Sequence, residues 1–330
     1  MRIRLISAHD LKQAIPMPRA VEAMARAFSA LSSGEARVPL RIHMEGGGVT
    51  TLAMPAYLPE GEGFPEALCV KVVTVSAENR SRGLPSVQAL VLVFHPTTGV
   101  PLALVEGGSL TALRTGAASG LATQIMANPG ASVLAVFGAG VQARTQVEAI
   151  HAVRPLTSLR IVSRGGDSAR AMARELRDAG GTFTIDAVDS PMEALKGADL
   201  VATATDSAIP VFPGEAVEPG THVNAVGAYT PAMREVDGVL VGRSRVVVDS
   251  REGALAEAGD LTGAFQAGEA SPSVVIGELG EVLTGGIVAR TSPTDITLFK
   301  SVGSGAQDAV IAGLLIQALE RGEVGREVEL

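Results

Sequence analysis

The sequence predicts an α/β protein with a doubly wound parallel sheet, joined to a smaller α+β domain. Residues 1–127 carry alternating strand patterns between helical ones, whereas short, fully apolar segments alternate with helical patterns beyond residue 128. A glycine-rich turn follows the first of those apolar segments. Apolar strands that alternate with helices are typical of a parallel sheet covered on both faces. A chain of 330 residues is long enough for two such domains.

The N-terminal part is expected to be mostly antiparallel sheet with flanking helices. Residues 3–7 predict a strand, and Ser7 with Asp10 resembles the start of a helix. Pro18 at a first helical position opens a longer helix that ends near Gly34. Apolar and polar residues alternate over 37–45, which predicts a half-buried strand. The further expected elements are strands at 49–57 and 68–75, a hairpin of 87–94 and 102–105, and a helix that Ser109 caps and that continues through Ala127.

The pattern changes at Ala127-Asn128-Pro129-Gly130, which breaks helices and marks the predicted domain boundary. Beyond it we expect strands at 133–137, 159–162, 200–204, 222–226 and 246–248, with helices at 141–151, 167–179 and 191–197. After residues 297–302 an amphipathic helix, 306–321, is expected to return to the first domain. The predicted domains are therefore residues 1–127 with 306–330, and residues 128–305.

The composition excludes several classes of function. The formal net charge is −8 without a long run of like charges, whereas a nucleic-acid surface needs clustered Lys and Arg. Cys69 is the only cysteine, so an intrachain disulfide is impossible. The N-terminus lacks the pattern of a signal peptide, and no apolar stretch is long enough to span a membrane. We expect a cytoplasmic protein that binds neither nucleic acid nor membrane.

The sharpest motif is the glycine-rich turn after the strand 133–137. Gly138-Ala139-Gly140-Val141-Gln142-Ala143 follows a buried strand and opens a helix, which is the context of the dinucleotide fingerprint. Gly138 permits the tight turn, Gly140 allows a pyrophosphate to approach, and Ala143 keeps helix and strand close. The alternative is an ordinary glycine-rich connection. We predict that this turn belongs to a Rossmann domain and binds the pyrophosphate of a dinucleotide.

The end of the second strand of that domain indicates which dinucleotide is bound. NAD enzymes usually carry Asp or Glu there for the ribose hydroxyls, but this chain has Ser163-Arg164-Gly165-Gly166. Arg164 can pair with a 2′-phosphate. Asp167 is nearby, although it begins the next helix, where an N-terminal capping role is the expected one. We therefore predict NADPH in preference to NADH.

Three cations precede the nucleotide domain. Lys71 interrupts an apolar strand, where a lysine must be paired or held at a site because burying it alone is costly. Arg114 lies in a helix of small residues, so its guanidinium has room to reach into a cleft. Arg41 lies on the polar face of its strand and shares that face with His43. A solvated surface arginine is the alternative for Arg41 and for Arg114.

No metal site is expected. The histidines at positions 9, 43, 95, 151 and 222 are scattered, and no pair has the spacing of metal ligands.

Several motifs together resemble the ornithine cyclodeaminase/mu-crystallin family over essentially the whole chain. They are Leu113-Arg114-Thr115-Gly116-Ala117-Ala118, the turn 138–143, Val223-Asn224-Ala225-Val226-Gly227 with Pro231 and Glu235, and Phe299-Lys300-Ser301-Val302-Gly303. The resemblance implies a homodimer that assembles through the N-terminal domain, with a site between the domains. The N-terminal part would bind substrate, and residues 128–305 would bind NAD(P).

The resemblance also implies roles for individual residues. Arg41 and Arg114 would bind a substrate carboxylate, and Lys71 would lie at the reacting carbon as the catalytic residue. The expected cofactor-binding residues are Thr115, Gly138, Ala139, Gly140, Val141, Gln142, Ser163, Arg164, Gly165, Thr205, Val226, Ser301 and Val302.

Two departures from the family pattern bear on the reaction. Cyclodeaminases carry an Asp shortly after the Asn-Ala-Val-Gly motif, where this chain has Tyr229, and a Glu before the Met-Pro pair, where it has Leu52. Cyclodeamination needs a carboxylate to accept and return protons. Reduction of an imine needs only an oriented substrate carboxylate, a hydride donor and one proton source. The site therefore resembles the ketimine-reducing branch of the family.

The expected activity is NADPH-dependent reduction of cyclic α-imino acids. The substrates would be Δ1-pyrroline-2-carboxylate or Δ1-piperideine-2-carboxylate, and the products L-proline or L-pipecolate. Ornithine cyclodeamination and reductive amination of a keto acid, as in alanine dehydrogenase, are the enzymatic alternatives. A nucleotide-dependent ligand-binding protein without turnover is the alternative of another class.

Overall fold

The computed structural model describes residues 2–329 and contains two compact units. One unit comprises residues 1–114 and 304–330, and the other comprises residues 115–303. The division falls within the helix α3 (Gly107–Met126), whereas the predicted boundary lay after its end. The Pro-Gly pair ends this helix, but the helix itself begins in one unit and ends in the other. Among the described residues, no helix is both long and apolar enough to cross a membrane.

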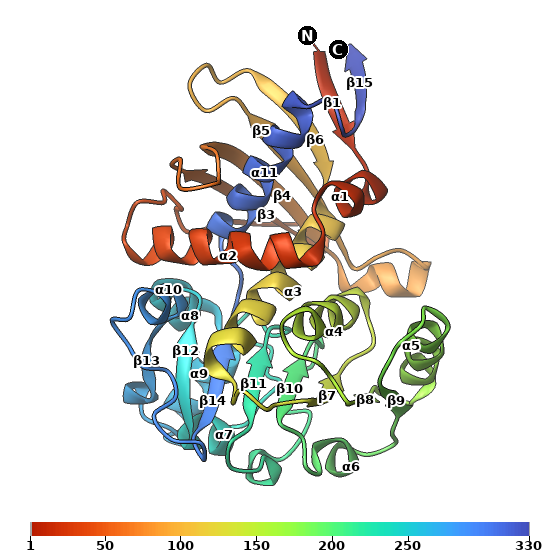
Figure 1. Ribbon diagram of the computed structural model, residues 1–330, viewed down its shortest axis with the longest axis vertical. Helices are drawn as coiled ribbons and strands as arrows, with labels where there is room; N and C mark the ends of the chain where they lie inside the picture. Colours follow the sequence, from red (N-terminus) through yellow and green to blue (C-terminus); the bar gives the residue numbers. More distant parts are fainter. Residues whose placement is uncertain (1, 330) are drawn as a thin grey trace. The chain divides into compact units, whose positions relative to one another are not determined.

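The first unit is built on a seven-stranded sheet (Figure 1). Its strands are β1 (Arg2–Ile6), β2 (Ile42–Gly46), β3 (Val49–Leu58), β4 (Ala67–Val75), β5 (Val87–Phe94), β6 (Pro101–Glu106) and β15 (Arg326–Glu329). They lie in the order β15-β1-β6-β5-β4-β3-β2. Only β1 and β6 run parallel, and the other neighbours are antiparallel. The prediction of a mostly antiparallel N-terminal sheet is confirmed.

Helices α1 (Ala8–Ala14), α2 (Met17–Ser32) and α11 (Gly305–Glu320) complete this unit, with a short 3-10 helix at Ala77–Arg82. Ser7 and Asp10 form the reciprocal cap of α1 that the sequence predicts. α11 packs against β3, β4 and α2 (Figure 1). A Cβ on Gly305 would lie 2.9 Å from the Cβ of Ala56 in β3, so glycine allows the helix to approach the sheet closely.

The strand predicted at 37–45 differs most from the structure in this unit. β2 starts only at Ile42, and Arg37 makes an isolated bridge to Tyr57. Pro39 has no N–H to donate to a neighbouring strand, which explains the late start. β2 is an edge strand, and all of its residues are exposed rather than half-buried.

The second unit is built on an eight-stranded sheet whose pairings are all parallel. Its strands are β7 (Val133–Phe137), β8 (Ser158–Val162), β9 (Thr184–Ala187), β10 (Leu200–Thr203), β11 (His222–Ala225), β12 (Ser244–Val248), β13 (Val275–Glu278) and β14 (Ile296–Lys300). They lie in the order β13-β12-β14-β11-β10-β7-β8-β9. The order reverses beside β7, as in doubly wound nucleotide-binding sheets. The predicted fold class is confirmed.

The connecting helices of this unit are α4 (Val141–Val153), α5 (Asp167–Asp178), α6 (Pro191–Leu195), α7 (Gly238–Arg243), α8 (Arg251–Glu257), α9 (Gly259–Gln266) and α10 (Leu279–Leu283). Short 3-10 turns occur at Gly214–Ala216 and Pro272–Val274. The start of α3 differs from the prediction, because Ser109 is not its cap. The helix begins at Gly107, and the Glu106 carboxylate accepts hydrogen bonds from the backbone N–H groups of Gly108 and Ser109.

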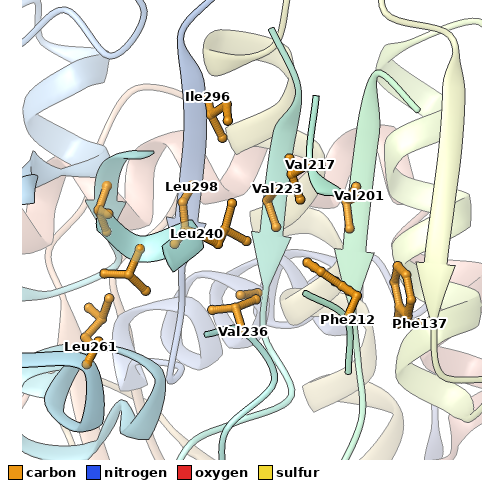
Figure 2. Close-up of a cluster of buried hydrophobic side chains, with 14 of the residues drawn as sticks. Phe137, Val201, Phe212, Val217, Val223, Val236, Leu240, Leu261, Ile296 and Leu298 are labelled. Carbon is orange, nitrogen blue, oxygen red and sulfur yellow. The ribbon is translucent and has the colours of Figure 1, made fainter. Parts of the chain in front are cut away.

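Apolar residues cover both faces of the parallel sheet. Phe137 and Val201 belong to a core on one face, where the rings of Phe137 and Phe212 pack at a tilt of 49° and a centroid distance of 4.6 Å (Figure 2). The adjacent residues Val136 and Leu200 belong to a second core on the opposite face. Successive residues of a strand point to opposite faces, so the apolar side chains of residues 134–137 in β7 and 200–202 in β10 fill both cores alternately.

A buried polar network joins the end of α3 to the middle of this sheet. His222 Nδ1 lies 2.9 Å from Thr297 Oγ1, and His222 Nε2 lies 3.2 Å from Asn224 Oδ1. Asn224 in turn donates to Thr123 Oγ1 on α3 at 2.9 Å. Burial and the nearby Arg290 cation lower the pKa of His222 to about 3. His222 is therefore neutral in the folded protein at neutral pH.

This network predicts a specific loss of stability in acid. The pKa of His222 is lower in the folded chain than its ordinary value of 6.5, so the unfolded chain binds the proton first as the pH falls. The free energy of unfolding therefore decreases as the pH falls below 6.5. At pH 5 the decrease due to His222 amounts to about 2 kcal/mol. Urea denaturation at pH 7 and pH 5 should show this loss in the wild type but not in His222→Gln. His9→Gln, which changes an exposed histidine, is the matched control. Equal pH dependence in the wild type and His222→Gln would contradict the prediction.

Candidate active site

The glycine-rich turn leads from β7 into α4. Gly138 has a φ of 108°, and a Cβ there would lie 2.5 Å from the carbonyl oxygen of Ala204, so only glycine fits. Gly140 is the N-cap of α4, and no side chain caps that helix terminus. A Cβ on Gly140 would meet nothing within 4 Å, so the space beside it is open. The turn thus presents backbone N–H groups to an open space, which fits a pyrophosphate.

Arg144 on α4 fixes the orientation of this turn. Sequence reasoning did not identify this role of Arg144. Its Nη1 donates to the carbonyl oxygens of Ala139 at 2.7 Å and Gly140 at 3.2 Å. Its Nε donates to the Glu175 carboxylate of α5 at 2.9 Å. These bonds hold the carbonyl groups of the turn toward Arg144. Val141 and Gln142 form the first turn of α4, and Gln142 Oε1 is buried without a hydrogen-bond partner among the described residues.

The turn after β8 contains the residues predicted to select the cofactor. Ser163 Oγ accepts hydrogen bonds from the Ala169 N–H at 3.0 Å and from Ser168 Oγ at 2.8 Å. Arg164 is exposed, and within residues 2–329 its side chain has no hydrogen bond or ion pair. Gly165 has a φ of 78°, and Gly166, rather than Asp167, is the N-cap of α5. Asp167 is the first residue of that helix and pairs with Arg170 at 3.0 Å.

The remaining predicted cofactor residues of this unit follow the carboxyl ends of three other parallel strands. Thr205 follows β10, Val226 follows β11, and Ser301 with Val302 follows β14. The carboxyl ends of parallel strands lie at one edge of a sheet, where ligands of such folds bind. The structure therefore brings these residues to the same edge as the turns after β7 and β8.

Buried carboxylates hold these strand ends, and sequence reasoning assigned them no role. Glu235 accepts hydrogen bonds from Thr205 N–H at 2.6 Å, Thr205 Oγ1 at 2.8 Å and Gly227 N–H at 2.7 Å. Asp249 accepts from Ser301 Oγ at 2.7 Å and from Val302 N–H at 2.9 Å. The hydroxyl groups of Thr205 and Ser301 therefore bind carboxylates of the protein itself.

A buried ion pair between Asp260 and Lys300 holds the backbone at Glu235. Asp260 Oδ1 accepts from the backbone N–H of Glu235 at 2.6 Å, and its Oδ2 lies 2.7 Å from Lys300 Nζ. Lys300 also donates to the carbonyl oxygen of Ala228 at 2.6 Å. Glu235, Asp260 and Lys300 are all completely buried. Their bonds fix the backbone at 226–228, immediately before Tyr229.

In the first unit, Lys71 and Arg114 meet at a carboxylate that was not predicted. Lys71 Nζ lies 2.7 Å from Asp308 Oδ2, and Arg114 Nε lies 3.3 Å from Asp308 Oδ1. Lys71 is 1% exposed, Arg114 6% and Asp308 0%. Arg114 Nη1 also donates to Gln307 Oε1 at 2.8 Å. The only local signal for Asp308 is an acidic residue in the first turn of a predominantly apolar helix.

The charge state of Lys71 is balanced by its surroundings. Burial lowers its pKa to about 8, the cations Arg114 and Arg41 act in the same direction, and Asp308 opposes them. At neutral pH the ammonium form still predominates, and it releases its proton more readily than an exposed lysine. A group with these properties can serve as a general acid.

His43 lies on the face of the sheet that Lys71 occupies, and the charge of Arg41 acts on Lys71. His43 pairs with Leu52 across β2 and β3, and Met54 pairs with Lys71 across β3 and β4. Arg41 directly precedes β2, two residues before His43, rather than lying within the strand. Leu52 is buried on this face.

Other predicted residues take different places. Thr115 is buried in α3, and its carbonyl oxygen accepts a hydrogen bond from Gln146 Nε2 at 3.4 Å. Tyr229 packs against the core of the second unit. Cys69 is buried, and burial raises the pKa of its thiol, so it is an inert apolar residue. Across the described residues, no group of three His, Cys, Asp or Glu side chains could hold a metal ion.

Comparisons with known proteins show which family the chain belongs to. The model of the ornithine cyclodeaminase/mu-crystallin family matches residues 3–323. The chain is 36% identical to a Δ1-pyrroline-2-carboxylate reductase of Bacillus cereus, over 98% of this chain and 99% of the relative. It is similar to the Δ1-pyrroline-2-carboxylate reductase of Thermococcus litoralis in complex with NADH and L-proline, with a TM-score of 0.93, 40% identity, and coverage of 99% of this chain and 100% of that one. An archaeal alanine dehydrogenase dimer with bound NAD gives a TM-score of 0.91 at 31% identity, with both chains fully covered. The chain belongs to the ornithine cyclodeaminase/mu-crystallin family.

Proposed function

We propose that this protein is an NAD(P)H-dependent reductase of cyclic α-imino acids, which converts Δ1-pyrroline-2-carboxylate to L-proline and Δ1-piperideine-2-carboxylate to L-pipecolate. The observation that carries the proposal is the buried Lys71 ammonium, 2.7 Å from Asp308 and beside Arg114. Two relatives that are similar over nearly their whole length are named Δ1-pyrroline-2-carboxylate reductases. A location in the cytoplasm is part of this proposal.

The cations of the first unit supply what the chain must provide for this reaction. Reduction of a C=N bond adds a hydride to the carbon and a proton to the nitrogen. In our proposal Arg41 and Arg114 bind the substrate carboxylate, because arginine pairs with a carboxylate through two N–H groups. Lys71 gives its proton to the imine nitrogen and regains one from water. A pKa of about 8 suits a proton donor at neutral pH.

The second unit would hold the coenzyme. The open space at Gly140 and the uncapped terminus of α4 fit its pyrophosphate. Gly138 to Gln142 would bind that group, Ser163 to Gly165 the adenosine ribose, and Thr205, Val226, Ser301 and Val302 the nicotinamide ring, with Thr115 nearby. Bound NAD(P)H supplies the hydride. The buried carboxylates Glu235 and Asp249 keep the backbone of the nicotinamide-binding segments in place.

Cyclodeamination is disfavoured by the residues at two positions. Leu52 is buried, and Tyr229 packs on an apolar core, so neither position offers a carboxylate for proton transfer to and from an amine. Oxidative deamination of alanine, or its reverse, is the second candidate, because the archaeal alanine dehydrogenase has the same fold over the whole chain. That reaction uses an open-chain substrate with ammonia rather than a preformed imine.

Substrate assays separate these activities. Oxidation of NADPH should be fastest with Δ1-pyrroline-2-carboxylate or Δ1-piperideine-2-carboxylate. It should be slower by roughly 100-fold with pyruvate plus ammonia, and ornithine should give proline more slowly by a similar factor. The reason is that no side chain replaces the missing carboxylates as a base. Faster turnover of pyruvate or ornithine than of either imine would refute the proposed function. With the imines and with pyruvate plus ammonia, coenzyme oxidation is followed at 340 nm, where the reduced but not the oxidised coenzyme absorbs. Ornithine cyclodeamination consumes no coenzyme overall, so the proline that it forms is measured by chromatography.

The coenzyme preference is a finer part of the proposal. The turn after β8 carries no carboxylate before Asp167, and Asp167 pairs with Arg170. Arg164 is exposed at the tip of that turn. An exposed guanidinium there favours the 2′-phosphate of NADPH, although the Thermococcus relative was solved with NADH.

Two substitutions at this turn test the preference. Ser163→Asp combined with Arg164→Ala removes the cation and adds a charge that repels the 2′-phosphate. The ratio of kcat/KM for NADPH over NADH should fall by about 10- to 100-fold. Arg174→Ala, which changes an exposed arginine further along α5, is the matched control. A wild-type preference for NADH, or an unchanged ratio in the double variant, would contradict the assignment of Arg164.

We also propose that the protein is a homodimer formed through the outer face of the first sheet. Ile42, Ala53, Val72 and Leu90 form one cross-strand row on the face opposite Lys71. Ile42 is 63% exposed and Leu90 51% exposed in the single chain. An exposed apolar sheet face usually marks an interaction surface, and the archaeal relative is described as a dimer.

A charge in this row should separate the subunits. Light scattering during gel filtration should give a dimer for the wild type. Leu90→Asp should shift the protein toward monomer, because the carboxylate would be buried without a partner. Val288→Asp replaces an exposed apolar residue of the second unit and should remain dimeric. A monomeric wild type would refute the proposal, and a dimeric Leu90→Asp would exclude this face.

A further inference from the structure

Asp308 is a buried carboxylate in the predominantly apolar helix α11. It lies in the first turn of α11, and no residue from Gly305 to Ile316 is exposed. Burial of an unpaired carboxylate costs several kcal/mol. The position of Asp308 near a helix N-terminus offsets part of that cost. The rest must come from its partners, so those partners indicate what the residue does.

The two partners of Asp308 come from two different elements and touch different oxygens. Lys71 on β4 lies 2.7 Å from Oδ2, and Arg114 on α3 lies 3.3 Å from Oδ1. Both partners are cations to which the proposed function gives a direct role. The carboxylate thus sets the separation of the proton donor and the arginine that binds the substrate.

Gln307, the neighbouring residue, holds Arg114 at a second point. Its Oε1 accepts from Arg114 Nη1 at 2.8 Å and from the Ser304 N–H at 2.9 Å. Two donors at one atom fix that atom as the amide oxygen. The guanidinium of Arg114 is therefore oriented by two consecutive residues of α11.

Charged groups from three parts of the first unit act on Lys71: from α11, from α3 and from the segment before β2. Asp308 on α11 stabilises the ammonium form, whereas Arg114 on α3 and Arg41 before β2 disfavour it. Cys69, on β4 itself, is a neutral thiol, and His43 lies one cross-strand row away. Asp308 is the anion that opposes burial and two cations. Without it, the ammonium form of Lys71 loses its principal electrostatic support.

We propose that Asp308 is a positioning residue that keeps Lys71 protonated and directed, while Gln307 orients the guanidinium of Arg114. This inference rests on the proposed function, in which Lys71 protonates the imine nitrogen. Asp308 makes the ammonium available at neutral pH. Gln307 affects substrate binding rather than proton transfer. The two neighbouring residues therefore have separable effects on kcat and on KM.

Asp308→Asn tests the inference on the enzyme saturated with coenzyme. The value of kcat for Δ1-pyrroline-2-carboxylate at pH 7.5 should fall by about threefold or more, because a pKa that drops by one unit from about 8 lowers the protonated fraction of Lys71 by that factor. The alkaline limb of its pH profile should move down by about one pH unit or more, because Lys71 loses its proton earlier. The KM for the coenzyme should change less than about twofold. Glu320→Gln, an exposed carboxylate on the same helix, should behave as the wild type.

Gln307→Leu should give the opposite pattern. This substitution removes the hydrogen bond between residue 307 and the Arg114 guanidinium. The KM for the imine should therefore rise by about 10-fold, while the alkaline limb of the pH profile of kcat stays in place. Loss of kcat in both variants with an unmoved pH profile would show a merely structural role for the α11 turn and would overturn the inference.

A measurement on Lys71 itself is independent of the reaction. The chain contains four lysines, so NMR of protein labelled with 13C at the lysine Cε gives a simple spectrum, in which Lys71→Arg identifies the resonance. The midpoint of the Lys71 titration should lie near pH 8 in the wild type and lower in Asp308→Asn.

If Asp308→Asn does not fold, Gln307→Glu is the second variant. It adds a carboxylate beside Arg114 and should raise the midpoint of the Lys71 titration. An inactive wild type with shifted midpoints would refute only the proposed function, whereas an active wild type with unshifted midpoints would refute only the role of Asp308.

Discussion

The buried contact between Asp308 and Lys71 joins parts of the first unit that are far apart in sequence. It connects the C-terminal helix α11 to the central strand β4, and Arg114 on α3 shares the same carboxylate. A charge pair with so little exposure is costly to form and more costly to break, because either partner alone would be a buried charge. Such a pair specifies where α11 lies on the sheet. It also keeps a titratable amine inside a unit whose core is otherwise apolar.

The second unit uses buried carboxylates in a different way. Glu235 and Asp249 mainly accept hydrogen bonds from backbone N–H and hydroxyl groups at the ends of parallel strands. These strand ends belong to loops, which would otherwise be the most mobile part of a nucleotide-binding sheet. Carboxylates make stronger hydrogen bonds than neutral acceptors, so the loops are held without bulky side chains.

The sequence allowed the second sheet and its glycine turn to be predicted because those signals are local. Apolar runs such as Val133–Phe137 show buried strands directly, and Gly138 with Gly140 marks the turn. β9, β13 and β15 were missed because each has only four residues, charged ones among them, so their pairing depends on neighbouring strands. Lys71 and Arg114 could be singled out as cations in apolar or small-residue surroundings. Asp308 could not be paired with them, because the contact joins residues more than 190 positions apart.

The neutral residues around Lys71 matter as much as the charged ones. Leu52 lies one cross-strand row from Lys71 on the same sheet face and is buried. A carboxylate at that position would be a second anion near the ammonium and would raise the pKa of Lys71. A lysine that holds its proton more tightly is a weaker acid toward an imine nitrogen. The carboxylate would, however, supply the base that removal of an amine requires. In the proposed reaction, leucine there and one carboxylate at Asp308 favour giving a proton to a preformed imine over taking one from an amine.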